Sequence, residues 1–278
     1  MSGTDTIILI FIAILGASIG SFLNVLIYRT PRDLNIAYPS SHCPHCNNNL
    51  KWYHNIPIFS WIFLQGKCAY CKEKISLRYP IVELLSALIF LLIFLKNGVN
   101  PYSFLLSLTF ALLLALSLID FEYKAVPDSI NLSALTLSFF TSPTILQNFI
   151  NALLLAGAFS LLRFYVSYYV SLKEEFRLKR RLKSAPWLKS YFPQPVMIEA
   201  MGEGDIIVAA TIGAVLGVKL SVIAIFLSAI LAIPASIFLK VSKKEVELPY
   251  IPFLAMAFFT VYLFDEKLNT LLEWFING

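Results

Sequence analysis

Residues 202–210 read Gly202-Glu203-Gly204-Asp205-Ile206-Ile207-Val208-Ala209-Ala210, and no further charged residue follows until Lys219. An aspartate at the mouth of such an apolar run is costly to desolvate, so it marks a candidate functional site in a membrane protein. The two glycines allow a sharp turn or a close approach of the backbone to a substrate. The segment therefore predicts a membrane helix that begins beside a reactive carboxylate. A paired-carboxylate site would need a second acid at the same depth.

The composition indicates a membrane protein. The chain has 278 residues, of which 58% are hydrophobic and 14% charged, whereas soluble domains have about 25% charged residues. The mean hydropathy is +0.73. The net charge is +5, but the basic residues lie between apolar runs, which is a topology pattern and predicts no nucleic-acid partner.

Eight apolar runs predict an all-α polytopic membrane protein with about eight transmembrane helices in a lipid bilayer. A hydrocarbon core of about 30 Å needs roughly 20 helical residues, and several runs are shorter. The first run has no basic residue before it, so we expect a retained helix; its small residues suit close helix packing, and Asn24 is expected to form an interhelical hydrogen bond. The runs lie at about 6–28, 80–95, 101–119, 127–141, 149–170, 206–218, 220–239 and 250–264.

The basic residues predict the orientation of the helices. Most of the 22 lysines and arginines lie in alternate connections, chiefly 29–78 and 171–198, and the side with this excess is the cytoplasmic side. The third run ends at Asp120, shortly before Val126-Pro127-Asp128. In this topology, Asp120 and Asp205 face the cytoplasm at similar depth.

Such a pair of carboxylates can hydrolyse an amide. Two close aspartates share a proton, because both cannot ionise cheaply. The ionised partner can take a proton from water while the protonated partner polarises a peptide carbonyl. The pair titrates as a unit, so neither residue receives a fixed role. The alternative is that each aspartate only caps or flanks a helix, where an acid interacts well with the helix dipole.

The polar insert at 29–78 contains all four cysteines, arranged as two CxxC pairs: Cys43, Cys46, Cys68 and Cys71. This spacing predicts a closed, structural zinc site of four thiolates. Disulfides are the alternative, but a reducing cytoplasm disfavours them. His42 or His45 could replace a thiolate ligand, although a complete cysteine set makes this unnecessary.

The chain resembles the type IV prepilin peptidases, the membrane aspartic peptidases of type IV pilus and type II secretion systems. The resemblance rests on four patches in the order of that family, from residue 20 to residue 205. They are Gly20-Ser21-Phe22-Leu23-Asn24-Val25 with Arg29; the cysteine pairs with Asn55-Ile56-Pro57, Arg78-Tyr79-Pro80 and Glu83; Ile119-Asp120 with Val126-Pro127-Asp128; and Gly202-Glu203-Gly204-Asp205, which matches the family's GxGD.

By this resemblance, Asp120 and Asp205 are catalytic, and Gly202 and Gly204 support them. The expected reaction removes the short basic leader of prepilins or pseudopilins at the cytoplasmic face of the bacterial inner membrane. Asp128 could bind substrate, but we favour a helix cap. Two positions depart from the family: Glu203 replaces a more usual apolar or aromatic residue, and Ile251 replaces a common glycine.

Many members of this family also methylate the new amino terminus with S-adenosylmethionine. The cysteine-bearing insert here resembles the insert of these bifunctional members. The sequence has no G-x-G-x-x-G segment that would assign residues to this cofactor. The basic segment 171–198 is interpreted as an amphipathic helix on anionic lipid, because a basic leader would be attracted instead by Glu122, Glu199 and Glu203.

We expect three parts: a first helix at 1–28, the zinc-binding insert at 29–78 and a peptidase core at 79–278. A proton-coupled transporter is an alternative, but it would need acids at the bilayer midplane and perhaps inverted repeats. A presenilin-like protease also carries GxGD and would cut other substrates. A zinc-anchored assembly scaffold is a further alternative.

Overall fold

The computed structural model describes residues 3–184, 202–242 and 248–277. These residues form helices and no β-strand, which confirms the predicted all-α fold. The helices are α1 (Gly3–Arg29), α2 (Phe59–Phe63), α3 (Arg78–Asn97), α4 (Pro101–Tyr123), α5 (Asp128–Phe139), α6 (Ile145–Ser184), α7 (Glu203–Ser242), α8 (Ile251–Leu263) and α9 (Asp265–Asn277), with short 3-10 turns at Thr30–Arg32 and Trp52–Asn55.

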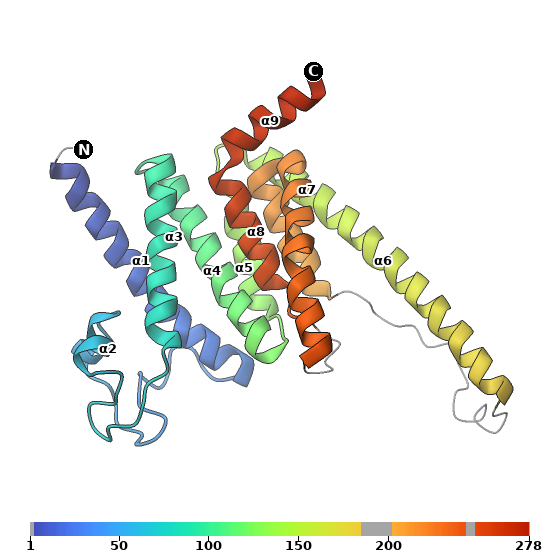
Figure 1. The fold of residues 1–278 in the computed structure, drawn as a ribbon. Helices are drawn as coiled ribbons and strands as arrows, with labels where there is room; N and C mark the ends of the chain where they lie inside the picture. The colour runs from blue at the N-terminus through green and yellow to red at the C-terminus, as the bar shows by residue number, and fades with distance from the viewer. Residues whose placement is uncertain (1–2, 185–201, 243–247, 278) are drawn as a thin grey trace.

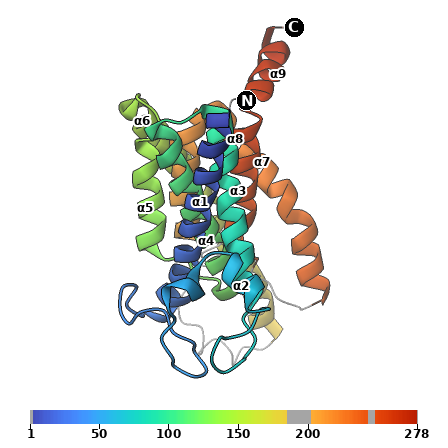
Figure 2. The same ribbon diagram turned by 90° about the vertical axis from the view of Figure 1, so that its left-hand side faces the viewer.

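The long helices pack side by side in a bundle (Figure 1). α4 lies near the centre and contacts α1, α3, α5 and α8, while α7 packs against α5, α6 and α8. Figure 2 shows the insert with α2 at one end of this bundle, and α9 projecting from the other end. The buried core is apolar and includes Phe90, Leu113, Leu116, Ile212 and Phe258.

Glycines in α1 allow the first helix to lie against α3. A Cβ atom at Gly16 would lie 2.9 Å from Cα of Ala87, and one at Gly20 would lie 2.7 Å from Cα of Glu83. These distances leave no room for a larger residue, as expected where small residues four apart bring two helices together. The Asn24 amide donates to the carbonyl oxygen of Tyr79 at 3.2 Å, which confirms the predicted interhelical bond.

α7 consists of two segments that turn back on each other at Gly217. This glycine has φ 70° and ψ 171°, a backbone conformation that side chains rarely permit. The Ser221 hydroxyl donates to the carbonyl oxygen of Ile212 at 3.3 Å. Nine residues of a straight helix would extend about 13.5 Å, so this bond requires a reversal of direction. The turn lies one residue before the end of the predicted run at 206–218, close to its boundary with the run at 220–239.

Within the part of the chain that the structure describes, five helices are long and apolar enough to cross a membrane: α1, α3, α4, α6 and α7. α8 is apolar but has 13 residues, and α5 has 12. The structure therefore supports a multi-pass membrane protein, whereas the number of eight spans stays a prediction.

Two features of the fold differ from the sequence prediction. α6 does not end near residue 170 but continues to Ser184, so the described part of the basic segment 171–198 extends a long helix and is not a separate one. Residues 185–198 lie outside the described residues. In addition, α9 was not predicted.

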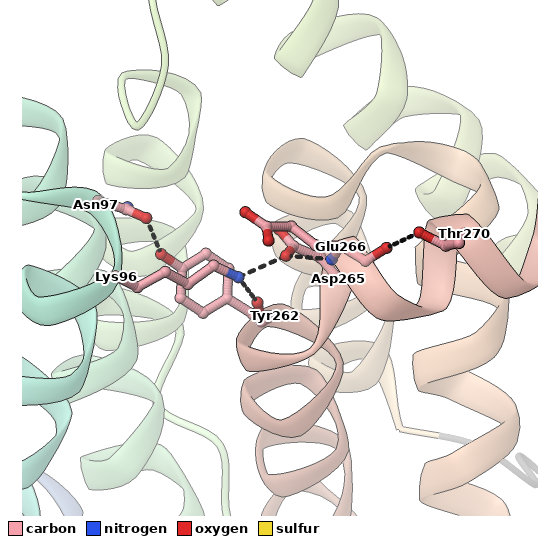
Figure 3. A network of polar contacts seen from close by, with 6 residues as sticks. All are labelled: Lys96, Asn97, Tyr262, Asp265, Glu266 and Thr270. Carbon is pink, nitrogen blue, oxygen red and sulfur yellow. Dashed lines mark hydrogen bonds and ion pairs between the residues drawn. The ribbon is translucent and has the colours of Figure 1, made fainter.

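The start of α9 is held to α3 by a polar network at the end of the bundle opposite the insert (Figure 3). The Lys96 ammonium forms an ion pair of 2.6 Å with Asp265 and also donates to the carbonyl oxygen of Tyr262. The Tyr262 hydroxyl donates to Asn97 at 2.9 Å. This network fixes the junction between α8 and α9.

Candidate active site and cysteine cluster

Asp120 is buried in the last turns of α4, with 7% of its surface exposed. Its carboxylate accepts a hydrogen bond of 3.0 Å from the backbone N–H of Ile251, at the beginning of α8, and a second one from the N–H of Tyr250. The first N–H groups of a helix have no partner within the helix. Asp120 therefore supplies the hydrogen-bond acceptor that the N–H groups at the start of α8 lack, and these N–H groups in turn hold the carboxylate in place.

Asp205 lies in the first turn of α7, partly buried. Its carboxylate accepts from the backbone N–H of Gly202, and it lies close enough to Asp120 for the two charges to interact. It also interacts with Tyr250, whose hydroxyl is hydrogen-bonded to Ser228 at 2.7 Å. The structure thus brings together the two aspartates that sequence analysis singled out, at the ends of two different helices.

Gly204 fixes the position of the first turn of α7. A Cβ atom there would lie 2.7 Å from Cγ1 of Val126, in the connection between α4 and α5. The carbonyl oxygen of Gly204 accepts a 3.0 Å bond from the side-chain amide of the fully buried Asn131. Gly202 has more room, because the nearest atom to its Cβ would be a carboxylate oxygen of Asp205 at 3.7 Å. The two glycines therefore have different structural roles.

Two of the three acids expected to attract a basic leader are already paired with arginines. Glu122 forms an ion pair of 2.6 Å with Arg78, which joins the end of α4 to the beginning of α3. Glu203 forms one of 2.9 Å with Arg163 of α6, although its own side chain remains 80% exposed. Glu199 lies outside the described residues. Glu203 is thus largely exposed to solvent and also forms an ion pair with α6.

Asp128 is exposed in the first turn of α5, where a negative charge suits the helix dipole. The residue at the N-cap position itself is Pro127. Four groups that form hydrogen bonds at the candidate site were not recognised from the sequence. They are the N–H groups of Tyr250 and Ile251 and the side chains of Asn131 and Ser228. Backbone donors carry no side-chain signal, and the two side chains are ordinary polar residues of apolar helices.

The four cysteines converge in the insert. Their Sγ atoms all lie within 4.8 Å of one another, and those of Cys43 and Cys71 are 3.8 Å apart. A tetrahedral zinc with Zn–S bonds of about 2.3 Å requires sulfur atoms about 3.8 Å apart, so the geometry fits this ion. Disulfide bonds would require about 2.05 Å, and all four cysteines are free. Neither His42 nor His45 belongs to the cluster.

The two CxxC turns have the same backbone design. Asn47 and Lys72, each directly after the second cysteine of its pair, have φ values of 55° and 63°. Their N–H groups donate to the carbonyl oxygens of Cys43 and Cys68. Burial opposes ionisation of the Cys68 thiol, but hydrogen bonds from the N–H groups of Cys71 and Tyr70 and from neighbouring thiols outweigh it and lower the pKa to about 7. A thiolate is the form that binds metal.

Glu83 joins the insert to the helical bundle. Its buried carboxylate, on α3, accepts a hydrogen bond of 2.6 Å from the N–H of Ile58 and another from Ser21 of α1. Ile58 has φ 63° and ψ −52°, an unusual backbone conformation for a β-branched residue. Glu83 is therefore engaged in holding the insert to α1 and α3.

Two family models match the chain. Residues 14–97 match one described as the bacterial peptidase A24 N-terminal domain, and residues 107–237 match one described as the type IV leader peptidase family. The second match contains both aspartates, and the first contains the cysteine cluster and Glu83.

Curated relatives extend the similarity over most of the chain. A prepilin leader peptidase/N-methyltransferase of Stutzerimonas stutzeri is 31% identical over 92% of this chain and 90% of that protein. One of Vibrio cholerae is 30% identical over 93% of this chain and 97% of that protein. One of Myxococcus xanthus is 35% identical over 74% of this chain but only 56% of that protein. No solved structure matches.

Proposed function

Because the chain belongs to the type IV leader peptidase family, we propose that it is a membrane aspartic endopeptidase that removes the leader of type IV prepilins or pseudopilins. Asp120 and Asp205 are the catalytic pair in this proposal. The observation that supports it is the electrostatic interaction between these two carboxylates, which come from the ends of α4 and α7.

The pair acts on a water molecule and a peptide carbonyl. One carboxylate is ionised and removes a proton from the water, while the other is protonated and donates to the carbonyl oxygen. The N–H groups at the start of α8 orient Asp120, and Gly202 and Gly204 place Asp205. The water oxygen bonds to the carbonyl carbon, and proton transfer to the leaving amine then breaks the C–N bond and releases the leader from the mature chain.

The distribution of basic residues supports placing this reaction at the cytoplasmic face of the inner membrane. The cysteine insert, the end of α1 and the beginning of α3 all lie at one end of the bundle (Figure 1). Arg29, Arg32 and Arg78 lie at that end, which the positive-inside rule makes cytoplasmic. A substrate would place its leader on this side and its apolar helix in the bilayer.

Cys43, Cys46, Cys68 and Cys71 would hold a structural zinc ion in the insert. Four thiolates leave no open coordination position, so the ion would stabilise the fold of the insert and not take part in hydrolysis. The relatives' names include an N-methyltransferase activity, and we extend the proposal to methylation of the new amino terminus with S-adenosylmethionine.

The test is cleavage of a synthetic prepilin by the purified, reconstituted protein. Asp120→Asn and Asp205→Asn should each lower kcat by about a thousandfold or more, because one carboxylate of the pair can no longer exchange its proton. Asp128→Asn is the matched control and should stay within a few-fold of the unchanged protein. Full activity of either pair variant would refute the proposal.

Mass spectrometry of the same reaction tests methylation. With labelled S-adenosylmethionine present, the processed product should gain the mass of one methyl group. A product without this gain would restrict the protein to peptidase activity.

A further inference from the structure

The C-terminal part of α6 carries aromatic and basic side chains on one face. The residues on this face are Tyr169, Leu172, Lys173, Phe176, Arg177 and Arg180, and all of them except Leu172 are exposed. Neighbouring members of this set are one or three positions apart, and alternate members are four apart, so the residues form a continuous stripe along the helix. We call these six residues the α6 stripe.

The cations of the α6 stripe are only partly compensated. Among the residues that the structure describes, Lys173 and Arg180 have no ion-pair partner, and both are exposed. Arg177 pairs with Glu174, yet its side chain remains 61% exposed. Three exposed cations on one face of a helix suit an anion with several acceptor oxygens, such as a phosphate group.

The position of the α6 stripe indicates where such a phosphate comes from. Phe164, Tyr165 and Tyr168 precede it on α6 with exposed fractions of 54–66%, and exposed aromatic residues of this kind gather at membrane–water interfaces. α6 has 40 residues and is thus about 60 Å long, twice the hydrocarbon thickness of about 30 Å. It leaves the bundle obliquely, and its last turns reach the end of the molecule where the insert lies (Figure 1).

We propose that the α6 stripe binds the headgroup of an anionic phospholipid. Lys173, Arg177 and Arg180 contact the phosphate oxygens, and Leu172 and Phe176 contact the first part of an acyl chain. A free phosphate ion would leave these apolar side chains without a partner, which favours the lipid. The proposal is independent of the catalytic pair, because it concerns binding alone.

The experiment measures lipid binding to the full-length protein in mild detergent by native mass spectrometry. Phosphatidylglycerol, phosphatidylcholine and inorganic phosphate are added in separate titrations. The unchanged protein should prefer phosphatidylglycerol. Each of Lys173→Gln and Arg180→Gln should weaken its binding about fivefold, and the double variant by tenfold or more, given the usual attraction of one cation to an anionic lipid surface.

Lys179→Gln is the matched control. It removes the same charge from α6, but Lys179 lies outside the α6 stripe and pairs with Glu175 at 2.6 Å. Its phosphatidylglycerol binding should be unchanged. The proposal is overturned if the double variant keeps the original preference, if Lys179→Gln weakens binding equally, or if inorganic phosphate binds as well as the lipid. Circular dichroism establishes that each variant retains its helices, and the single variants decide the question if the double variant misfolds.

Discussion

The carboxylate of Asp120 and the backbone N–H of Ile251, which are 131 positions apart in the sequence, form a hydrogen bond of 3.0 Å. The bond links the end of α4 to the beginning of α8. Ile251 can hold this position because its side chain is packed in the core and only 1% exposed. The apolar packing of α8 therefore determines where one member of the proposed catalytic pair lies.

Truncation of Ile251 should affect both stability and catalysis. Ile251→Ala leaves a cavity and should lower the free energy of unfolding by about 2–4 kcal/mol. It should also reduce kcat more than it changes KM, because the N–H donor that orients Asp120 can shift. Cleavage kinetics and thermal unfolding of the purified variant measure the two effects.

Ile251→Val is the control for this experiment. It keeps a β-branched side chain and should cost only about 1 kcal/mol. An alanine variant that unfolds more easily yet keeps the original kcat would mean that Asp120 does not depend on α8.

The helical fold and the electrostatic interaction between the two aspartates were both predictable. Apolar runs of membrane length allow few structures other than helices. Charged loops then assign each helix end to a side, which places Asp120 and Asp205 on the same side of the membrane at similar depth. The contact with Ile251 was not predictable, because its donor is a backbone group and the sequence differs there from the glycine common in the family.

Gly204 should tolerate alanine less well than Gly202. A Cβ atom at Gly204 would lie 2.7 Å from Val126, so Gly204→Ala must displace the first turn of α7 and with it Asp205. We expect a destabilisation of about 1–3 kcal/mol, as for other overpacked sites, and at least a tenfold loss of kcat. Gly202→Ala should leave the free energy of unfolding within about 0.5 kcal/mol of the original value.

The double variant Val126→Ala/Gly204→Ala makes this prediction specific. Removal of the Val126 methyl groups should restore part of both the stability and the kcat that Gly204→Ala loses. Strictly additive effects of the two substitutions would show that the clash does not cause the loss. A Gly202→Ala protein that is stable but inactive would instead indicate that substrate approaches the backbone at Gly202.

The charges around the site show where sequence reasoning was incomplete. Glu122 and Glu203 were expected to attract a basic leader, and their arginine partners come from α3 and α6, far away in the sequence. The extent of α6 was also missed, because hydropathy decreases after residue 170. Helix-forming charged residues continue the helix, supported by ion pairs such as Glu175 with Lys179.

Removal of metal from the cysteine cluster should unfold the insert before the helical bundle. The purified protein should contain one zinc ion per chain by elemental analysis, and Cys68→Ser should lose it. Metal affinity should rise with pH, because the thiols must lose their protons before they bind. If limited proteolysis shows that the insert stays folded after a chelator has removed the metal, the structural role of the ion is contradicted.

Glu83 should control how firmly the insert is attached to the bundle. Glu83→Ala leaves the N–H of Ile58 without its acceptor, at a residue whose φ of 63° already costs conformational energy. The loss of an acceptor for a buried donor is worth about 1–3 kcal/mol, so the insert should open about 5- to 150-fold more often. Limited proteolysis within residues 29–78 should accelerate accordingly, since cleavage follows the open population. Glu83→Gln keeps an acceptor oxygen and should be cut more slowly than the alanine variant; equal rates for both would show that another contact holds the insert.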